Sequence, residues 1–104
     1  MEQAVIVHLR LSDRRVGTPQ EREAMYELEE QLEQAIKKAS AGEFDGDEFG
    51  EGECVLFMYG PDADDLYQVI EPVLKLASLA AGGYAIKRYG DTFDLNASEV
   101  RVTW

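Results

Sequence analysis

The side chains best suited to chemistry in this sequence are six carboxylates crowded between residues 43 and 53. They are Glu43, Asp45, Asp47, Glu48, Glu51 and Glu53. Carboxylates at alternate positions around a glycine turn are the oxygen ligands that Ca²⁺ prefers. When Asp45 is taken as the first position of a calcium loop, however, Phe49 falls at the fifth and Leu56 at the twelfth, where a bidentate Glu is required. The run therefore predicts a solvated acidic hairpin and no metal site.

The remaining candidates for catalysis are the single histidine, His8, and the single cysteine, Cys54. Both lie in apolar stretches, where a cysteine is more often a small core residue than a nucleophile. A catalytic carboxylate pair needs one desolvated and one solvated member, whereas the acidic groups of the hairpin are all expected to be exposed. Gly50-Glu51-Gly52 lacks the third glycine of a dinucleotide fingerprint and precedes a strand. We therefore predict a protein that is not an enzyme and that binds no cofactor.

The charge balance of the chain restricts its partners. The 21 acidic and 10 basic residues give a formal net charge of −11, which repels nucleic-acid phosphates and anionic membranes at long range. Neither nucleic acid nor a membrane is therefore an expected partner, whereas a basic protein fits this charge. The alternative is that the acidic surplus serves solubility alone. A single cysteine, and an N-terminus that reads as a strand and not as a signal peptide, favour the cytoplasm.

The strongest local signal is the start of the first helix. Thr18-Pro19-Gln20-Glu21 supplies an N-cap, a proline at the first helical position and the reciprocal Glu of a capping box. Apolar residues then recur every three or four positions to about Ser40, which predicts a helix with one buried face. Gly42 follows as the expected stop.

A second helix and several strands are expected around the first. The strands are predicted in five stretches: residues 3–11, 43–49, 53–59, 84–89 and 99–104. The second helix is expected to begin after the cap residue Asp62. Pro72 falls inside that helix, which predicts a kink near it or a break after Glu71.

The order of these elements, βαββαβ followed by one more strand, predicts the fold class. The economical solution is an α+β, ferredoxin-like split-βαβ sandwich, in which both helices cover one face of an antiparallel sheet and the C-terminal strand is an addition. The 104 residues suffice for one core, so we expect a single domain over residues 1–104. The block GEFDGDEFGEGECVLFMYGPDADDL, residues 42–66, resembles small uncharacterised bacterial ferredoxin-like proteins. That resemblance implies the fold and transfers no functional residue.

The candidate site is the sheet face that the helices leave open. Alternation along the strands gives a candidate partner-binding set: His8, Arg10, Phe57, Tyr59, Lys87 and Tyr89. The same assignment points Val5, Val7 and Ile86 toward the helices. Aromatic residues on the third strand of such a fold are typical of an RNA-recognition motif, but Glu53 stands where a basic residue belongs. We expect the C-terminal segment 91–104 or a second subunit to cover this face, in preference to a small ligand.

Two hypotheses of different classes follow. The first, which the charge and the apolar face favour, is a non-catalytic cytoplasmic interaction protein. It is either a homodimer through the sheet face or the acidic partner of a basic protein, for example of the inhibitor or immunity type. The second is a small-molecule-binding or enzymatic domain that uses the same face, an idea that rests on fold analogy.

Overall fold

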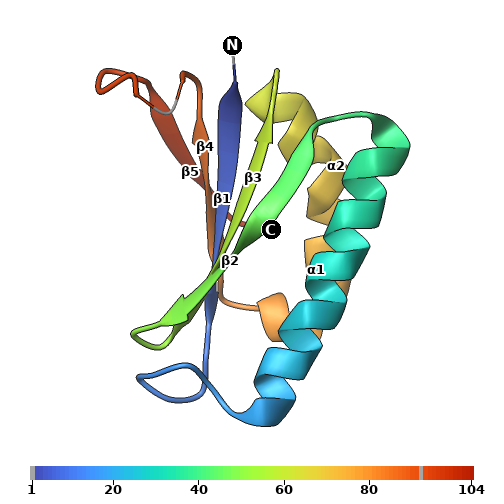
Figure 1. The fold of residues 1–104 in the computed structure, drawn as a ribbon, viewed down its shortest axis with the longest axis vertical. Helices are drawn as coiled ribbons and strands as arrows, with labels where there is room; N and C mark the ends of the chain where they lie inside the picture. Colours follow the sequence, from blue (N-terminus) through green and yellow to red (C-terminus); the bar gives the residue numbers. More distant parts are fainter. Residues whose placement is uncertain (1, 92) are drawn as a thin grey trace.

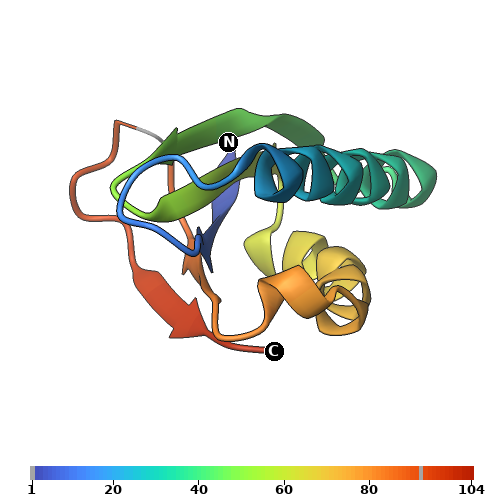
Figure 2. The ribbon, with the colours of Figure 1, turned by 90° about the horizontal axis from the view of Figure 1, so that it is seen from below.

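The computed structural model of this chain describes residues 2–91 and 93–104. Its elements in chain order are β1 (Gln3–Arg10), α1 (Pro19–Ala39), β2 (Glu43–Gly50), β3 (Glu53–Gly60), α2 (Ala63–Leu76), the 3-10 helix η1 (Ser78–Ala80), β4 (Tyr84–Arg88) and β5 (Glu99–Val102). The sheet has the order β2-β3-β1-β4-β5, and every neighbouring pair is antiparallel. Figures 1 and 2 show α1 and α2 on the same side of this sheet. The predicted α+β class, with two helices and an antiparallel sheet, is confirmed.

Helix α1 begins at the predicted capping box. The hydroxyl of Thr18 accepts the backbone N–H of Glu21 at 3.1 Å, and the Glu21 carboxylate accepts the N–H of Thr18 at 3.0 Å. The same carboxylate accepts the backbone N–H of Ser12 at 3.0 Å and also the Ser12 hydroxyl, which ties the preceding loop to the helix. These donors, the Ser12 hydroxyl first, lower the pKa of Glu21 below its usual value.

Helix α1 ends at Ala39, and the residue that stops it is Ser40 where Gly42 was expected. Ser40 takes the left-handed conformation, with a φ of 52°. Gly42 has a different role, because a Cβ atom there would collide with the backbone carbonyl of Tyr59 at the end of β3. Glycine therefore lets the connection from α1 to β2 pass close to the sheet.

Helix α2 begins as predicted, but it continues through its proline. The carboxylate of Asp62 accepts the N–H groups of Asp64 at 2.9 Å and Asp65 at 3.1 Å, which makes it the N-cap. The predicted break after Glu71 is wrong, since the helix runs on to Leu76. Pro72 is exposed, so the carbonyl that loses its donor one turn earlier lies on the water side of the helix.

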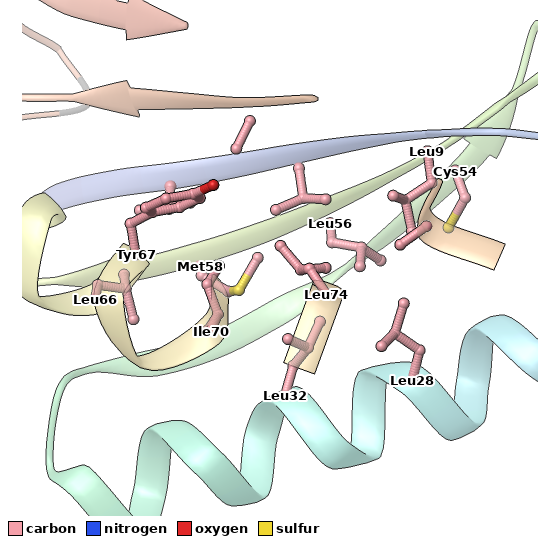
Figure 3. Packing of buried hydrophobic residues seen from close by; sticks show 14 of the residues in the cluster. Leu9, Leu28, Leu32, Cys54, Leu56, Met58, Leu66, Tyr67, Ile70 and Leu74 are labelled. Atoms are coloured by element: carbon pink, nitrogen blue, oxygen red, sulfur yellow. The ribbon is translucent and has the colours of Figure 1, made fainter. Parts of the chain in front are cut away.

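The core lies between the sheet and the two helices. Every second residue of β1 and β3 points into it, and both helices contribute the buried stripe that their spacing predicts, as Figure 3 shows. Its fully buried members include Val5, Val7, Leu9, Cys54, Leu56, Met58, Leu32, Leu66, Ile70 and Leu74. The prediction that Cys54 is a core residue is confirmed. No helix in the described part of the chain is both long enough and apolar enough to cross a membrane.

Candidate functional site: the open face of the sheet

The face of the sheet opposite the helices, called the open face below, is assigned by strand register. Residues that pair directly across neighbouring strands share a face. Because Val5, Val7 and Leu9 are in the core, the residues between them on β1 and their partners lie on the open face. Its members are Ala4, Ile6, His8 and Arg10 on β1, Glu53, Val55, Phe57 and Tyr59 on β3, Tyr84, Ile86 and Arg88 on β4, Glu43, Gly46, Glu48 and Gly50 on β2, and Glu99 and Arg101 on β5.

The predicted site residues divide between the two faces. His8, Arg10, Phe57 and Tyr59 lie on the open face, as the alternation predicts. The assignment of Lys87 and Tyr89 to this face is wrong, and so is the inward orientation of Ile86. In β4 the small residue Ala85 is the one that is fully buried, opposite Val7. A phase error of one residue moves every side chain of a strand to the other face.

Lys87 and Tyr89 instead fasten β4 to the start of α2. Both side chains donate to one oxygen of Asp64, Lys87 at 2.9 Å and Tyr89 at 2.6 Å. The ammonium of Lys87 also lies 5.5 Å from the centre of the Tyr67 ring. The hydrogen bonds from Tyr89 and Lys87 lower the pKa of Asp64, and the same contacts raise the pKa of Lys87 and of Tyr89. This cluster is a structural contact between layers and is no part of the open face.

A row of polar and aromatic contacts crosses four strands of the open face. The Nδ1 atom of His8 lies 3.4 Å from the carboxylate of Glu53 on β3. On its other side the His8 ring stacks on Tyr84 of β4, with ring centroids 4.6 Å apart and planes 8° from parallel. The guanidinium carbon of Arg101 on β5 lies 3.7 Å from the centre of the Tyr84 ring. These contacts order the side chains at one end of the face.

The middle of the open face is apolar and incompletely covered. The term apolar centre is used below for Ile6, Val55, Phe57, Tyr59 and Ile86, all of which are half-buried. Ile6 pairs with Phe57 on one side and with Ile86 on the other, so these three form a continuous row. Such a surface resembles a sheet face that lacks its covering layer.

The described residues of the C-terminal segment 91–104 cover only part of the open face, where Arg101 lies on Tyr84 and Asp94 contacts Arg88; Thr92 lies outside them. Strand β5 pairs with the edge of β4 and extends the sheet. The indole N–H of Trp104 donates to the carbonyl of Ala80 in η1 at 3.1 Å, which holds the chain end against that turn. In the β4–β5 connection Phe93 and Leu95 are 92% and 93% exposed, so their side chains cover nothing.

Charge is distributed unevenly on the two sides of β1. The acidic half of the open face consists of Glu43, Glu48 and Glu53 on β2 and β3. The basic half contains Arg88 and Arg101 on β4 and β5, with Glu99 among them. Arg88 binds the carboxylate of Glu99 at 2.9 Å and also donates to the backbone carbonyl of Asp94, which anchors the β4–β5 connection. One face therefore carries an acidic half, an apolar centre and a basic half.

A carboxyl group that the sequence interpretation missed lies between α1 and the acidic hairpin. Burial raises the pKa of Glu29 to about 8, and the neighbouring Asp47 adds to the shift by a hydrogen bond and by repulsion. Within the described residues, Glu29 Oε2 is a buried oxygen without a hydrogen-bond partner. The sequence did contain an indication of this partial burial, because Glu29 follows Leu28 and therefore lies at the margin of the buried stripe of α1.

This carboxyl pair combines the half-buried Glu29 with the exposed Asp47, and both groups act electrostatically on the thiol of Cys54. Cys54 is fully buried, and this burial is the main reason that the pKa of its thiol is raised to about 12. The negative charges of Glu29 and Asp47 raise this pKa further. A protonated and inaccessible thiol is a poor nucleophile. Within residues 2–91 and 93–104, no group of three or more His, Cys, Asp or Glu side chains is arranged to hold a metal ion.

The surface has hollows at the open face and on the helix side. At one end of the open face, Ile6, Tyr59 and Arg88 border a hollow of about 230 Å³, and Glu43 and Tyr59 border another of about 390 Å³. A larger hollow of about 600 Å³ lies on the helix side, between Leu28 of α1 and Val73 of α2. Pockets for small ligands usually measure roughly 300–1,000 Å³ and carry a few convergent polar groups. Of the two hollows at the open face, one is below that range and the other is near its lower end.

Comparison with known proteins adds no relative to this description. No protein-family model matches the chain, and no curated protein or solved structure matches it. Function is therefore inferred from the chemistry of the open face alone.

Proposed function

We propose that this protein is a non-catalytic interaction protein that associates with a second copy of itself through the open face. The observation that carries this proposal is the apolar centre, whose five side chains stay partly exposed although β5 extends the sheet beside them. Monomeric proteins rarely leave a large continuous apolar patch in water. Complete burial of a Phe or Ile side chain contributes about 1.5–3 kcal/mol of free energy. A half-buried side chain would contribute part of this free energy to dimer formation when the partner covers it.

The extent of the open face suits a protein partner. Strands spaced about 4.8 Å apart, with a rise of about 3.3 Å per residue, give a five-stranded sheet a face of roughly 20 by 25 Å. Because side chains project from the sheet, the accessible surface of this face is larger than its flat area. It approaches the roughly 800 Å² that each partner buries in a standard interface. A second copy supplies a surface of the same size and the same apolar centre.

The alternatives are less well supported by the same surface. A small ligand would use one of the hollows of about 230 and about 390 Å³ beside Tyr59, which lie below and near the lower end of the usual range for ligand pockets. A basic protein would be drawn to the net charge of −11, but the open face itself carries Arg88 and Arg101 as well as acidic groups. Both charge signs around an apolar middle fit a self-complementary contact better than a uniformly basic partner.

The strand order supports the finer part of the fold interpretation. The order β2-β3-β1-β4 of an antiparallel sheet, with α1 following β1 and α2 following β3, is the order expected of a ferredoxin-like split-βαβ sandwich. On this interpretation β5 is the additional C-terminal strand beside β4. A sandwich with helices on one face has its other face free for a partner.

The test is the mass of the purified protein in solution. We expect light scattering after size exclusion to give twice the chain mass for the unaltered protein, and the single chain mass for Phe57→Glu. The control is Leu76→Glu, because Leu76 is 89% exposed on the helix side and its replacement should leave the dimer intact. Circular dichroism checks that both variants are folded. A protein that remains monomeric at millimolar concentration contradicts the proposal.

A further inference from the structure

We infer that the two copies meet about a twofold axis that runs along β1, so that Glu48 at the β2 edge of each open face lies near Arg101 of the partner subunit, while Glu43 at the other end of β2 faces Glu99 of the partner subunit. This inference rests on the proposed function and names its geometry. It follows from the asymmetric distribution of charge across the sheet: Glu43 and Glu48 lie on β2, and Arg101 lies on β5. These strands are the two opposite edges of the sheet.

Two arrangements bring one sheet face against itself with the strands nearly aligned, as in most β-sandwiches. In the first, the twofold axis runs along β1, and β2 of each copy faces β5 of the other. In the second, the axis runs across the strands, and each strand faces its own copy. The second arrangement places Glu43 and Glu48 against the same carboxylates of the partner. Like charges at close range in an interface are unfavourable. The arrangement along β1 has fewer such contacts on β2, because it opposes Glu43 to Glu99 but brings Glu48 near Arg101.

The arrangement along β1 also matches the apolar centre. Ile6 lies on the central strand, so it meets its own copy at the axis. Phe57 and Ile86 occupy the two strands that flank β1 in the same row, and the twofold axis places each against the other in the partner. An aromatic ring then packs on an aliphatic side chain at two equivalent places.

The net charge favours an arrangement that brings opposite charges together across the interface. Each copy carries −11, and long-range repulsion therefore opposes self-association. Contact between the Glu48 edge and the Arg101 edge brings opposite charges together at both ends of the interface. Exposed ion pairs are individually weak, but the symmetry provides each of them twice.

Charge reversal at the two edges tests the inference. Glu48→Arg alone and Arg101→Glu alone should each weaken the dimer about fivefold, because each lost attraction becomes a repulsion that occurs twice. The double variant should return the dissociation constant to within about threefold of the original, since the pair is re-formed with its signs exchanged. The control for net charge is Glu30→Arg, because Glu30 is exposed on α1 and carries the same change of charge. Sedimentation equilibrium at moderate salt measures each constant.

A cysteine pair gives a second measurement that does not depend on charge. In a mixture of Glu48→Cys and Arg101→Cys variants, a short bismaleimide should link one variant to the other and should not link either variant to itself. The native thiol of Cys54 is fully buried and does not compete. Linking between two Glu48→Cys chains, or tighter dimers for Glu48→Arg than for its control, overturns the inference in favour of the axis across the strands. Charge variants without effect, in a dimer that Phe57→Glu dissociates, overturn the inference and leave the proposed function standing. A monomeric unaltered protein overturns both.

Discussion

The two faces of the sheet are built from the same strands and differ in what covers them. On the helix side Val5, Val7 and Leu56 are fully buried under α1 and α2. On the open face Ile6 and Phe57, their immediate neighbours in the sequence, are half-buried. Both faces of β1 and β3 therefore carry large apolar side chains, although only one of them has a covering layer among the described residues. The comparison shows that alternation in a strand predicts which residues share a face, and leaves open which face is complete.

Alanine substitutions at two adjacent residues of β3 should show the largest difference in stability between the two faces. Leu56→Ala should lower the free energy of unfolding by about 2–5 kcal/mol at every protein concentration, because it leaves a cavity in the core. Phe57→Ala should lower it by a smaller amount that grows with protein concentration, because its main loss is in the dimer. Denaturant melts at micromolar and at submillimolar protein make the comparison. Equal, concentration-independent losses would mean that Phe57 is an ordinary core residue.

Local signals predicted much of the fold, and long-range pairing explains the errors. The capping box at Thr18 and the cap at Asp62 involve residues within one turn of each other, so the sequence reveals them directly. The phase of β4 was wrong because Ala85 and Ile86 are both apolar, and the choice between them depends on the register with β1. The position of β5 beside β4, which leaves the open face only partly covered, is likewise set by strand pairing and not by a local signal.

The same limit applies to the candidate site. His8 and Phe57 could be placed on the open face because β1 and β3 have a clear alternation. The separation into an acidic and a basic half could not be predicted, since it requires the order of all five strands. The environment of Glu29 was also out of reach, because it depends on β2 bringing Asp47 against α1.

The helix side of the sheet also contains a carboxyl group, Glu29, that makes the stability of the protein depend on pH. The pKa of Glu29, on the helix side, is raised from 4.5 to about 8, mainly by burial. The folded state therefore favours the protonated form. The stability that this contributes is complete below about pH 4.5, and it is lost as the pH rises through about 8. Because solvent screens a half-buried carboxyl, we expect a loss of about 1–2 kcal/mol.

Two variants isolate this effect. Glu29→Gln should flatten the fall in stability between pH 5 and pH 9 in urea melts, since its amide does not titrate. Glu30→Gln, at the exposed neighbouring position, should keep the slope of the unaltered protein. An unchanged slope in Glu29→Gln would show that this carboxyl is ionised in the folded protein at neutral pH. The dissociation constant of the dimer should be the same in both variants, because Glu29 lies on the helix side of the sheet.

The smallest expected effect concerns the helix that completes the covered face. Thr18→Ala removes the acceptor of the Glu21 N–H and should destabilise the protein by about 1 kcal/mol. Thr18→Ser retains that acceptor and is the matched control. Thermal melts should show a lower midpoint for the alanine variant alone, whereas light scattering should show the same mass for both. If the alanine variant also dissociates, the N-terminus of α1 and the open face are coupled. If its midpoint does not change, the remaining bonds between Glu21 and Ser12 are sufficient to hold the start of the helix.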